Sequence, residues 1–253
     1  MEKFRELKER TARACQVLGV LGLAQGATGH VSSRIPGKDS ILIRARGRNE
    51  LGVQFTQADQ IIEVGAEGVA HADTPDGLEP PLEVYIHTQI YKRRPDVSAV
   101  VHVHPLSVVL FTICNKPLLP LYGAYDPPSA RLAIEGIPTY SRSILCDTPE
   151  RGDELADALA QSKCCMMRGH GITSVGRSVE EATLTAIHLN NLADVNYKAH
   201  LLGGAVPIPS DEQEFIYADR DGGRPPQPGE VPEGRPGALW RYYCSLADKA
   251  EKS

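Results

Sequence analysis

The sequence of 253 residues has no long apolar run, no run of basic residues and no cysteines in CxxC spacing. The longest nearly apolar stretch near its start, residues 17–24, is far shorter than the roughly 20 residues that span a bilayer, so we expect no membrane partner. A net charge of −5 argues against nucleic acid as the main partner. Residues 1–11 are charged throughout and lack the apolar core of a secretory signal, which leads us to expect a cytoplasmic protein.

The remaining composition is that of an ordinary globular protein. It is 42% hydrophobic and 23% charged, which argues against wholesale disorder. Six cysteines are present, and without an export signal we expect free thiols rather than disulfides or a zinc finger.

Hydrophobic patterns predict helices and strands mixed along most of the chain. Helices are expected at residues 2–24, 81–93, after Pro105, 147–162, 178–200 and 239–249. Strands are expected at residues 30–34, 40–46, 60–65, 99–104, 164–168 and 172–176. Glycine, proline and charge rise beyond Pro207, which predicts a loop or extended arm over 219–237. We therefore expect one α/β domain over residues 1–205 and a C-terminal arm with a terminal helix over 206–253.

The strongest local signal for chemistry is His102-Val-His104 on the expected strand at 99–104. Residues i and i+2 of a strand point to the same side, so both imidazoles can reach one point. This spacing suits a divalent metal of the zinc, manganese or iron type. Two histidines on a half-buried strand for unrelated reasons are the alternative.

Two more residues are candidate ligands of the same ion. His170 stands between two glycines directly after an apolar strand, where the backbone can approach a ligand closely; a solvated turn residue is the alternative. Glu83 lies in the first turn of the helix expected at 81–93, where the helix dipole alone favours a carboxylate. His87 is four residues further on the same side, and we interpret it as a packing or supporting residue.

Four blocks of sequence together resemble the class II aldolase/adducin family. These blocks are GATGHVSSR (26–34), PLEVYIH (81–87), RRPDVSAVVHVHP (93–105) and RGHGI (168–172). Their order and spacing match over roughly residues 5–205. The resemblance implies a three-layer α/β/α sandwich with a central mixed, largely antiparallel sheet, assembled as a homotetramer.

The resemblance also implies roles for individual residues. The metal ligands of the family map onto His102, His104 and His170, and the expected ion is Zn²⁺, Mn²⁺ or Co²⁺. The family's acid/base glutamate, which is also an occasional ligand, maps onto Glu83.

Departures from the sugar-phosphate aldolases of the family concern the phosphate site. His30 replaces the usual asparagine, a loop with Arg44 and Arg46 replaces a Thr-Gly turn, and Pro81-Leu82 replaces a Ser-Ser pair. Arginine forks suit carboxylates, and Pro81-Leu82 suits a flat apolar ring better than a phosphate. We therefore expect Arg44, Arg46 and Leu82 to contact a small dicarboxylate, with two solvated arginines as the alternative.

These variants resemble the family's decarboxylase branch, which acts on hydroxylated aromatic or pyridine dicarboxylates and related ring-cleavage products. The resemblance predicts a metal-dependent carboxy-lyase of aromatic catabolism in which Glu83 and His30 move protons, although His30 could instead be a satisfied strand histidine. It also predicts a tyrosine from a neighbouring subunit, at the position of Tyr122 or Tyr125. An aldolase for an unphosphorylated hydroxy-acid is the second interpretation, and an adducin-like binding module without catalysis is the third.

Overall fold

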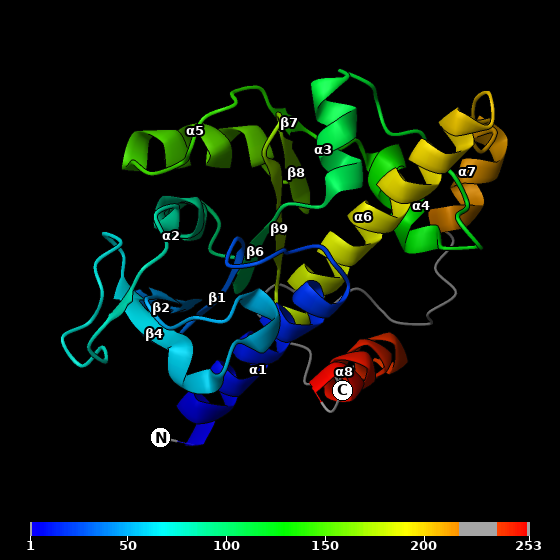
Figure 1. Cartoon of the computed structure of the whole chain (residues 1–253). Helices are drawn as coiled ribbons and strands as arrows, with labels where there is room; N and C mark the ends of the chain where they lie inside the picture. The colour runs from blue at the N-terminus through cyan, green and yellow to red at the C-terminus, as the bar shows by residue number, and fades with distance from the viewer. Residues whose placement is uncertain (1, 218–236, 252–253) are drawn as a thin grey trace.

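A seven-stranded sheet forms the middle of the structure, a computed structural model that describes residues 2–217 and 237–251 (Figure 1). The strand order is β4-β2-β1-β6-β9-β8-β7, and every neighbouring pair is antiparallel except β7 with β8. The sheet is therefore mixed and largely antiparallel. Its strands are β1 (His30–Arg34), β2 (Ser40–Arg44), β4 (Ile61–Gly65), β6 (Ala99–Val103), β7 (Thr139–Tyr140), β8 (Cys164–Met167) and β9 (Gly171–Gly176). A separate small pair consists of β3 (Arg46–Gly47) and β5 (Leu78–Glu79).

Helices cover both faces of the sheet, which confirms the three-layer arrangement (Figure 1). One face packs against α2 (Val84–Arg93) and α5 (Pro149–Leu159). The opposite face packs against α1 (Glu2–Val20), α3 (Leu106–Ile113), α4 (Pro127–Glu135) and α6 (Val179–Leu201). Two short 3-10 helices, Val53–Phe55 and Ala58–Gln60, lie beside α1. None of the described helices is long and apolar enough to cross a membrane.

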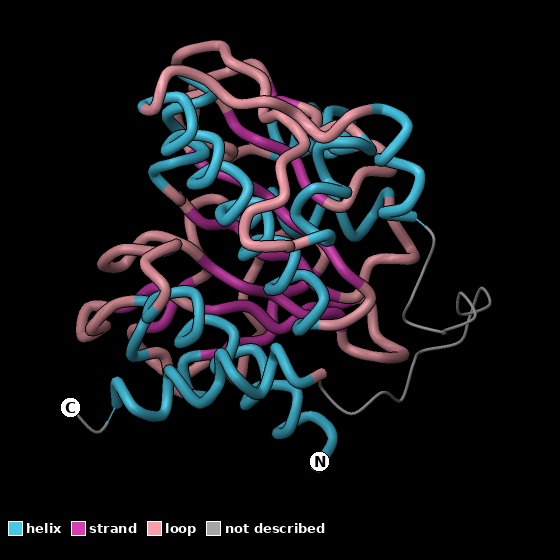
Figure 2. Tube along the Cα trace, turned by 90° about the vertical axis from the view of Figure 1, so that its right-hand side faces the viewer, coloured by secondary structure: helices cyan, strands magenta, loops and turns pink. Residues whose placement is uncertain are grey.

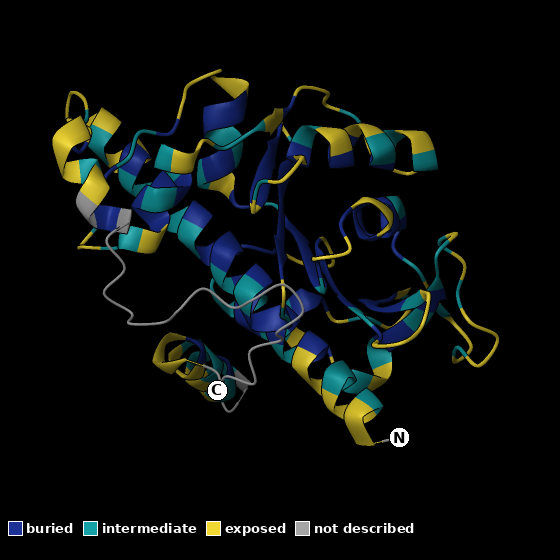
Figure 3. Cartoon of the chain, turned by 180° about the vertical axis from the view of Figure 1, so that it is seen from behind, coloured by how far each residue is buried: buried dark blue, intermediate teal, exposed yellow. Residues whose placement is uncertain are grey.

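Alternation along the central strands supplies both cores with apolar side chains. In β6, Val101 belongs to the core under α1 and α6, whereas Val100 belongs to the core under α2 and α5. His102 therefore points to the side of α2 and α5, because residues i and i+2 share a face. Cys164 and Cys165 divide between the two cores in the same way, so this pair fills the interior on both faces of the sheet. These strands are buried from end to end (Figure 3).

The C-terminal residues pack on the domain rather than away from it. Ile208 and Ile216 contact Ala130 of α4, with Ile216 carried by α7 (Ser210–Tyr217). The last helix, α8 (Ala238–Glu251), runs beside α1 (Figure 2), and Asp248 pairs with Arg13 at 2.7 Å. The sequence patterns did not predict α4 or α7. Residues 218–236, which hold nearly all of the expected loop, lie outside the described residues.

Several expected elements have different bounds. The strand expected at 40–46 ends at Arg44, and Arg46 belongs to β3 in the separate small pair, so the two arginines do not share one strand. The first helix ends at Val20 rather than near residue 24, because Gly22 adopts a positive φ of 74° that a continuing helix cannot use. The second helix begins at Val84 instead of Pro81, so that Glu83 is its N-cap residue. Because of this later start, the Glu83 side chain lies at the N-terminus of the helix and faces the end of β6.

Candidate metal centre

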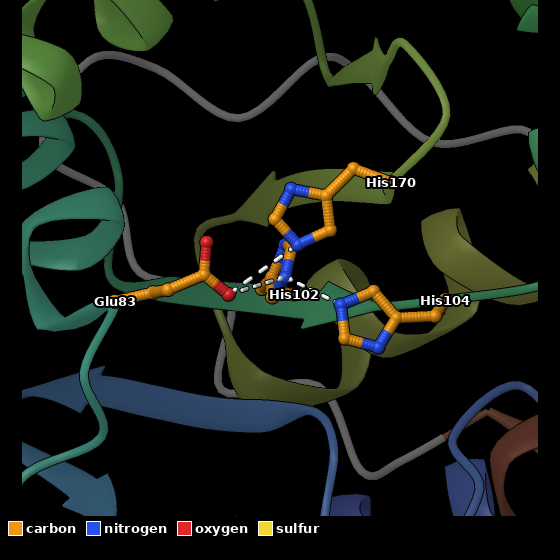
Figure 4. Close-up of side chains that lie close together, drawn as sticks. All are labelled: Glu83, His102, His104 and His170. Atoms are coloured by element: carbon orange, nitrogen blue, oxygen red, sulfur yellow. Dashed lines mark hydrogen bonds and ion pairs between the residues drawn. The ribbon is translucent and has the colours of Figure 1, made fainter. Parts of the chain in front are cut away.

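Three histidines and one glutamate bring their ligand atoms to one point beyond the end of β6 (Figure 4). One nitrogen each from His102, His104 and His170 and one oxygen from Glu83 lie within 4.8 Å of one another. The structure thus gathers all four residues that the resemblance assigned to the metal, from segments up to 87 residues apart between Glu83 and His170.

The sheet positions the three histidines. His102 lies in the middle of the sheet, paired with His30 of β1 on one side and with Thr173 of β9 on the other. His104 follows the last residue of β6, and its N–H donates to the carbonyl oxygen of Leu23 at 3.0 Å. His170 occupies the turn between β8 and β9, the two strands that continue the sheet from β6.

Glycine and threonine hold the turn that carries His170. Gly169 has a positive φ of 63°, a conformation that costs little only for glycine, and its N–H donates to Thr112 Oγ1 at 3.0 Å. Gly171 follows directly, and a Cβ there would lie 2.3 Å from the carbonyl oxygen of Val103. The glycines on both sides of His170 therefore serve close backbone approach, as the sequence predicted.

Glu83 approaches the histidines from the opposite side. The backbone N–H of Cys146 donates to Glu83 Oε1 at 3.1 Å, which turns Oε2 toward the histidines. Oε2 lies 3.4 Å from Nε2 of both His102 and His170. Burial alone would raise the pKa of Glu83, but hydrogen bonds to these two histidines hold that pKa well below its usual range. The carboxylate is therefore ionised, as a ligand of a cation must be.

The spacing and chemistry of these atoms fit a divalent metal. Nε2 of His104 lies 2.9 Å from Nε2 of His102. Two ligand atoms that each bind one zinc ion at about 2.0–2.1 Å are about 2.9–3.4 Å apart for angles between a right angle and a tetrahedral one. Burial, with the nearby His102, lowers the pKa of His104 to about 3, so its imidazole is neutral and able to donate a lone pair. A set of three imidazoles and one carboxylate suits zinc, manganese or cobalt.

His30 forms the wall of this centre behind His102. Its ring stacks on that of His102, with centroids 5.0 Å apart, and only 6% of the residue is exposed. Its Nδ1 lies 2.7 Å from Nε2 of His87, whose Nδ1 lies 2.6 Å from Ser32 Oγ. His30 is thus placed beside the metal ligands, and His87 has the supporting position expected for it.

Arg44 has a different environment from the one expected of a substrate-binding arginine. It is buried, pairs with Glu50, and donates to Thr56 and to the carbonyl oxygens of Ala27 and Gly29. These four hydrogen bonds leave at most one of its five N–H groups for any other partner. In this structure Arg44 braces the loop that leads into His30, and it offers no bidentate fork to a substrate.

The other predicted site residues, Arg46, Leu82 and the two tyrosines, lie in separate parts of the structure. Arg46 is half exposed, pairs with Glu79 at 2.5 Å and donates to the carbonyl oxygen of Pro80 at 3.0 Å. Leu82 is 56% exposed directly before Glu83, as a residue that lines the site would be. Tyr122 and Tyr125 stack on each other with centroids 5.2 Å apart, and Tyr122 packs in the cluster formed by α4 and α7.

Three supporting groups were missed in the sequence. Ser32 shares the strand face of His30, two residues away, and Tyr91 lies one helical turn after His87, so these two spacings could have indicated them. The Cys146 amide has no sequence signal, because it meets Glu83 only through the packing of α5 against α2.

Comparison with known proteins agrees with this geometry. The family model described as Class II Aldolase and Adducin N-terminal domain matches residues 9–197, which is most of the chain. The chain belongs to the class II aldolase and adducin family. The family match includes all four residues of the metal centre and His30.

Class II aldolase relatives resemble the chain in sequence and in fold. The 3,4-dihydroxyphthalate decarboxylase of Arthrobacter keyseri is 39% identical over 201 residues, 79% of this chain and 81% of that protein. The enzyme of the same name from Rhodococcus jostii is 37% identical and covers 93% of both chains. Among solved structures, the L-fuculose 1-phosphate aldolase of Glaciozyma antarctica matches with a TM-score of 0.78 at 21% identity, over 99% of this chain and 91% of that one. The last comparison establishes the shared fold alone.

Proposed function

We propose that this protein is a divalent-metal-dependent, non-oxidative decarboxylase of a hydroxylated aromatic dicarboxylate in aromatic catabolism. The observation that carries the proposal is the convergence of three imidazoles and one carboxylate on a single point. The choice of reaction is supported by relatives named as 3,4-dihydroxyphthalate decarboxylases, which are 37–39% identical over most of the chain. A 3,4-dihydroxyphthalate is therefore the first substrate to test.

In the proposed mechanism the chain's own residues hold the ion and the substrate. His102, His104 and His170 would hold the ion through Nε2, and Glu83 Oε2 lies close enough to be a fourth ligand. When bound, the ion would supply Lewis acidity to stabilise the negative charge that develops on a substrate oxygen when the carbon–carbon bond breaks. Carbon dioxide leaves, and a proton takes its place on the ring carbon.

Two residues beside the ligands are placed to orient the substrate and move this proton. Glu83 Oε2 faces the centre of the site and can accept a proton from a substrate hydroxyl. His30 stacks behind His102 and can contact the substrate's anionic oxygens through Nε2. Leu82, exposed beside Glu83, offers apolar surface to the aromatic ring. In a homotetramer, Tyr122 of a neighbouring subunit would reach the site as a further catalytic residue.

The test combines metal analysis with product analysis. Purified protein should contain stoichiometric zinc, manganese or cobalt, or take it up, and should release carbon dioxide from 3,4-dihydroxyphthalate or a related pyridine dicarboxylate. Replacement of His102 by Ala should abolish metal binding and turnover together, whereas His71→Ala should change neither, because His71 is exposed on a loop away from the ligands. Full turnover in His102→Ala would refute the site.

Aldehyde release from unphosphorylated hydroxy-acids, without carbon dioxide release, would select the aldolase alternative. A protein that binds no divalent metal would refute both enzyme interpretations and leave the binding-module interpretation. The native metal, the homotetramer and the cytoplasmic location remain parts of this proposal, and metal analysis with size-exclusion light scattering tests the first two.

A further inference from the structure

A chain of buried hydrogen bonds leads away from the metal centre behind His30. Nδ1 of His30 lies 2.7 Å from His87 Nε2, His87 Nδ1 lies 2.6 Å from Ser32 Oγ, and Ser32 Oγ lies 2.9 Å from the hydroxyl of Tyr91. Ser32 and His87 are fully buried, and His30 and Tyr91 are each 6% exposed. The four side chains come from β1 and α2, so this series of hydrogen bonds crosses from the sheet to the helix that covers it.

The hydroxyl of Tyr91 decides the direction of these hydrogen bonds. Within the described residues, the only acceptor within hydrogen-bond distance of this hydroxyl is Ser32 Oγ, and the backbone N–H of Val100 beside it is a donor. If Ser32 donated to Tyr91, the phenol hydrogen would be buried without an acceptor, which costs roughly 1–3 kcal/mol. Tyr91 therefore donates to Ser32, and the single hydrogen of the Ser32 hydroxyl must go to Nδ1 of His87.

The same order of donor and acceptor continues through His87 to His30. Burial, with the nearby His102, lowers the pKa of His87 to about 3, so the ring is neutral and carries one hydrogen. With Nδ1 of His87 as the acceptor, that hydrogen sits on Nε2 and is donated to Nδ1 of His30. A neutral His30 then carries its own hydrogen on Nε2, the ring nitrogen without a hydrogen bond within the described part of the chain.

We propose that Tyr91, Ser32 and His87 are positioning residues that hold His30 in its Nε2–H tautomer, so that His30 presents a hydrogen-bond donor to the substrate. This inference rests on the proposed function. An anionic substrate oxygen is attracted by an N–H group, whereas the other tautomer would present a lone pair and repel it. His30 keeps this hydrogen during turnover, because its loss would leave an imidazolate anion, and Glu83, which accepts a proton from a substrate hydroxyl, can return that proton to the ring carbon after carbon dioxide leaves.

Neutron diffraction from crystals of the zinc-loaded wild-type enzyme tests the tautomer directly. We expect deuterons on Nε2 of His30 and of His87, and the Tyr91 deuteron directed at Ser32. A deuteron on Nδ1 of His30 would overturn the proposal. This result does not depend on the substrate: a protein without decarboxylase activity would refute the proposed function, whereas the deuteron positions would still decide the tautomer.

Two substitutions of His87 test the consequence for turnover. His87→Phe keeps a ring but removes both nitrogens, and we expect full metal content, an unchanged KM and a kcat reduced by about 100-fold. His87→Gln can accept from Ser32 with its carbonyl and donate to His30 with its amide, so it should retain most of the activity. Equal losses in the two variants, or wild-type kcat in His87→Phe, would overturn the positioning role.

Tyr85→Phe is the matched control for these measurements. Tyr85 is a partly buried tyrosine on the same helix and belongs to the neighbouring apolar cluster. Tyr91→Phe removes the hydroxyl that donates to Ser32, and we expect it to lower kcat, whereas Tyr85→Phe should keep the wild-type kcat. Equal losses in the two variants would contradict the assignment of Tyr91 to the series of hydrogen bonds.

Discussion

Replacement of Gly171 by Ala should damage the metal centre through backbone packing alone, without changing a ligand. A Cβ at this position would lie 2.3 Å from the carbonyl oxygen of Val103 and 2.7 Å from Cδ2 of His104, whereas ordinary contact begins at 3.4 Å. The strand or the His104 ring must therefore move by about 1 Å, which is several times the roughly 0.2 Å tolerance of a metal–ligand bond.

The structure gives magnitudes for two separate effects of this substitution. Overpacking a well-packed interior costs about 1–3 kcal/mol, so we expect the free energy of unfolding to fall by that amount. Displacement of His104 should weaken metal binding by about 10-fold to 100-fold, the usual effect of disturbing what holds a ligand. Urea unfolding measures the first effect, and competition with a zinc chelator measures the second.

Gly176→Ala separates these two effects. Gly176 ends the same strand, and a Cβ there would lie 2.5 Å from the backbone nitrogen of Ala182, away from the ligands. We expect a similar loss of stability with unchanged metal affinity. Wild-type metal affinity in Gly171→Ala, or equal loss of affinity in both variants, would refute the reasoning.

Three further predictions concern stability. Because the pKa of His87 is lowered to about 3 from an ordinary value near 6.5, the unfolded chain binds a proton below pH 6.5 that the folded chain does not. This histidine alone should therefore lower the free energy of unfolding by about 1.4 kcal/mol per pH unit below 6.5, and His87→Gln should reduce the measured slope by that amount in urea titrations between pH 7 and pH 5, while the similar contribution of His104 remains. Ser178→Ala removes the hydroxyl that accepts from the Glu181 N–H at the start of α6, and should cost about 1 kcal/mol in the same assay; no change would show that the cap is dispensable. Trp240→Ala empties a buried site between α8 and the core, and should lower the free energy of unfolding by about 3–5 kcal/mol with full metal content, whereas loss of metal would contradict its purely structural role.

The ligands of the metal centre were predictable because their signals are local. Strand alternation alone places His102 and His104 on one side, and glycines on both sides of His170 indicate close backbone approach. The family resemblance added Glu83 and joined the separate segments. The main strands were predictable because each is a short run of apolar and β-branched residues, a pattern typical of a buried strand.

What the sequence did not reveal depends on contacts between distant segments or on competing patterns. Arg44 was expected to bind the substrate because its charge suggested a carboxylate partner. In the folded protein that carboxylate is Glu50, six residues later in the sequence. The Cys146 amide reaches Glu83 across 63 positions, and a backbone donor leaves no mark in the residue type. α4 was missed because it begins with Pro127-Pro128, a pair that also indicates a loop.

The placement of His102 in a strand paired on both sides also determines when the ion can arrive. Small zinc domains acquire their shape only when the metal binds, because their ligands lie on otherwise unstructured loops. Here the strand is held by backbone hydrogen bonds to β1 and β9 that do not involve an ion, so we expect the polypeptide to fold first and to take up the ion afterwards. A chelator would then strip the protein without melting it, and another ion could be added back to the same folded molecule. The ion carried in a cell would accordingly reflect which metal is abundant there as much as the preference of the ligands.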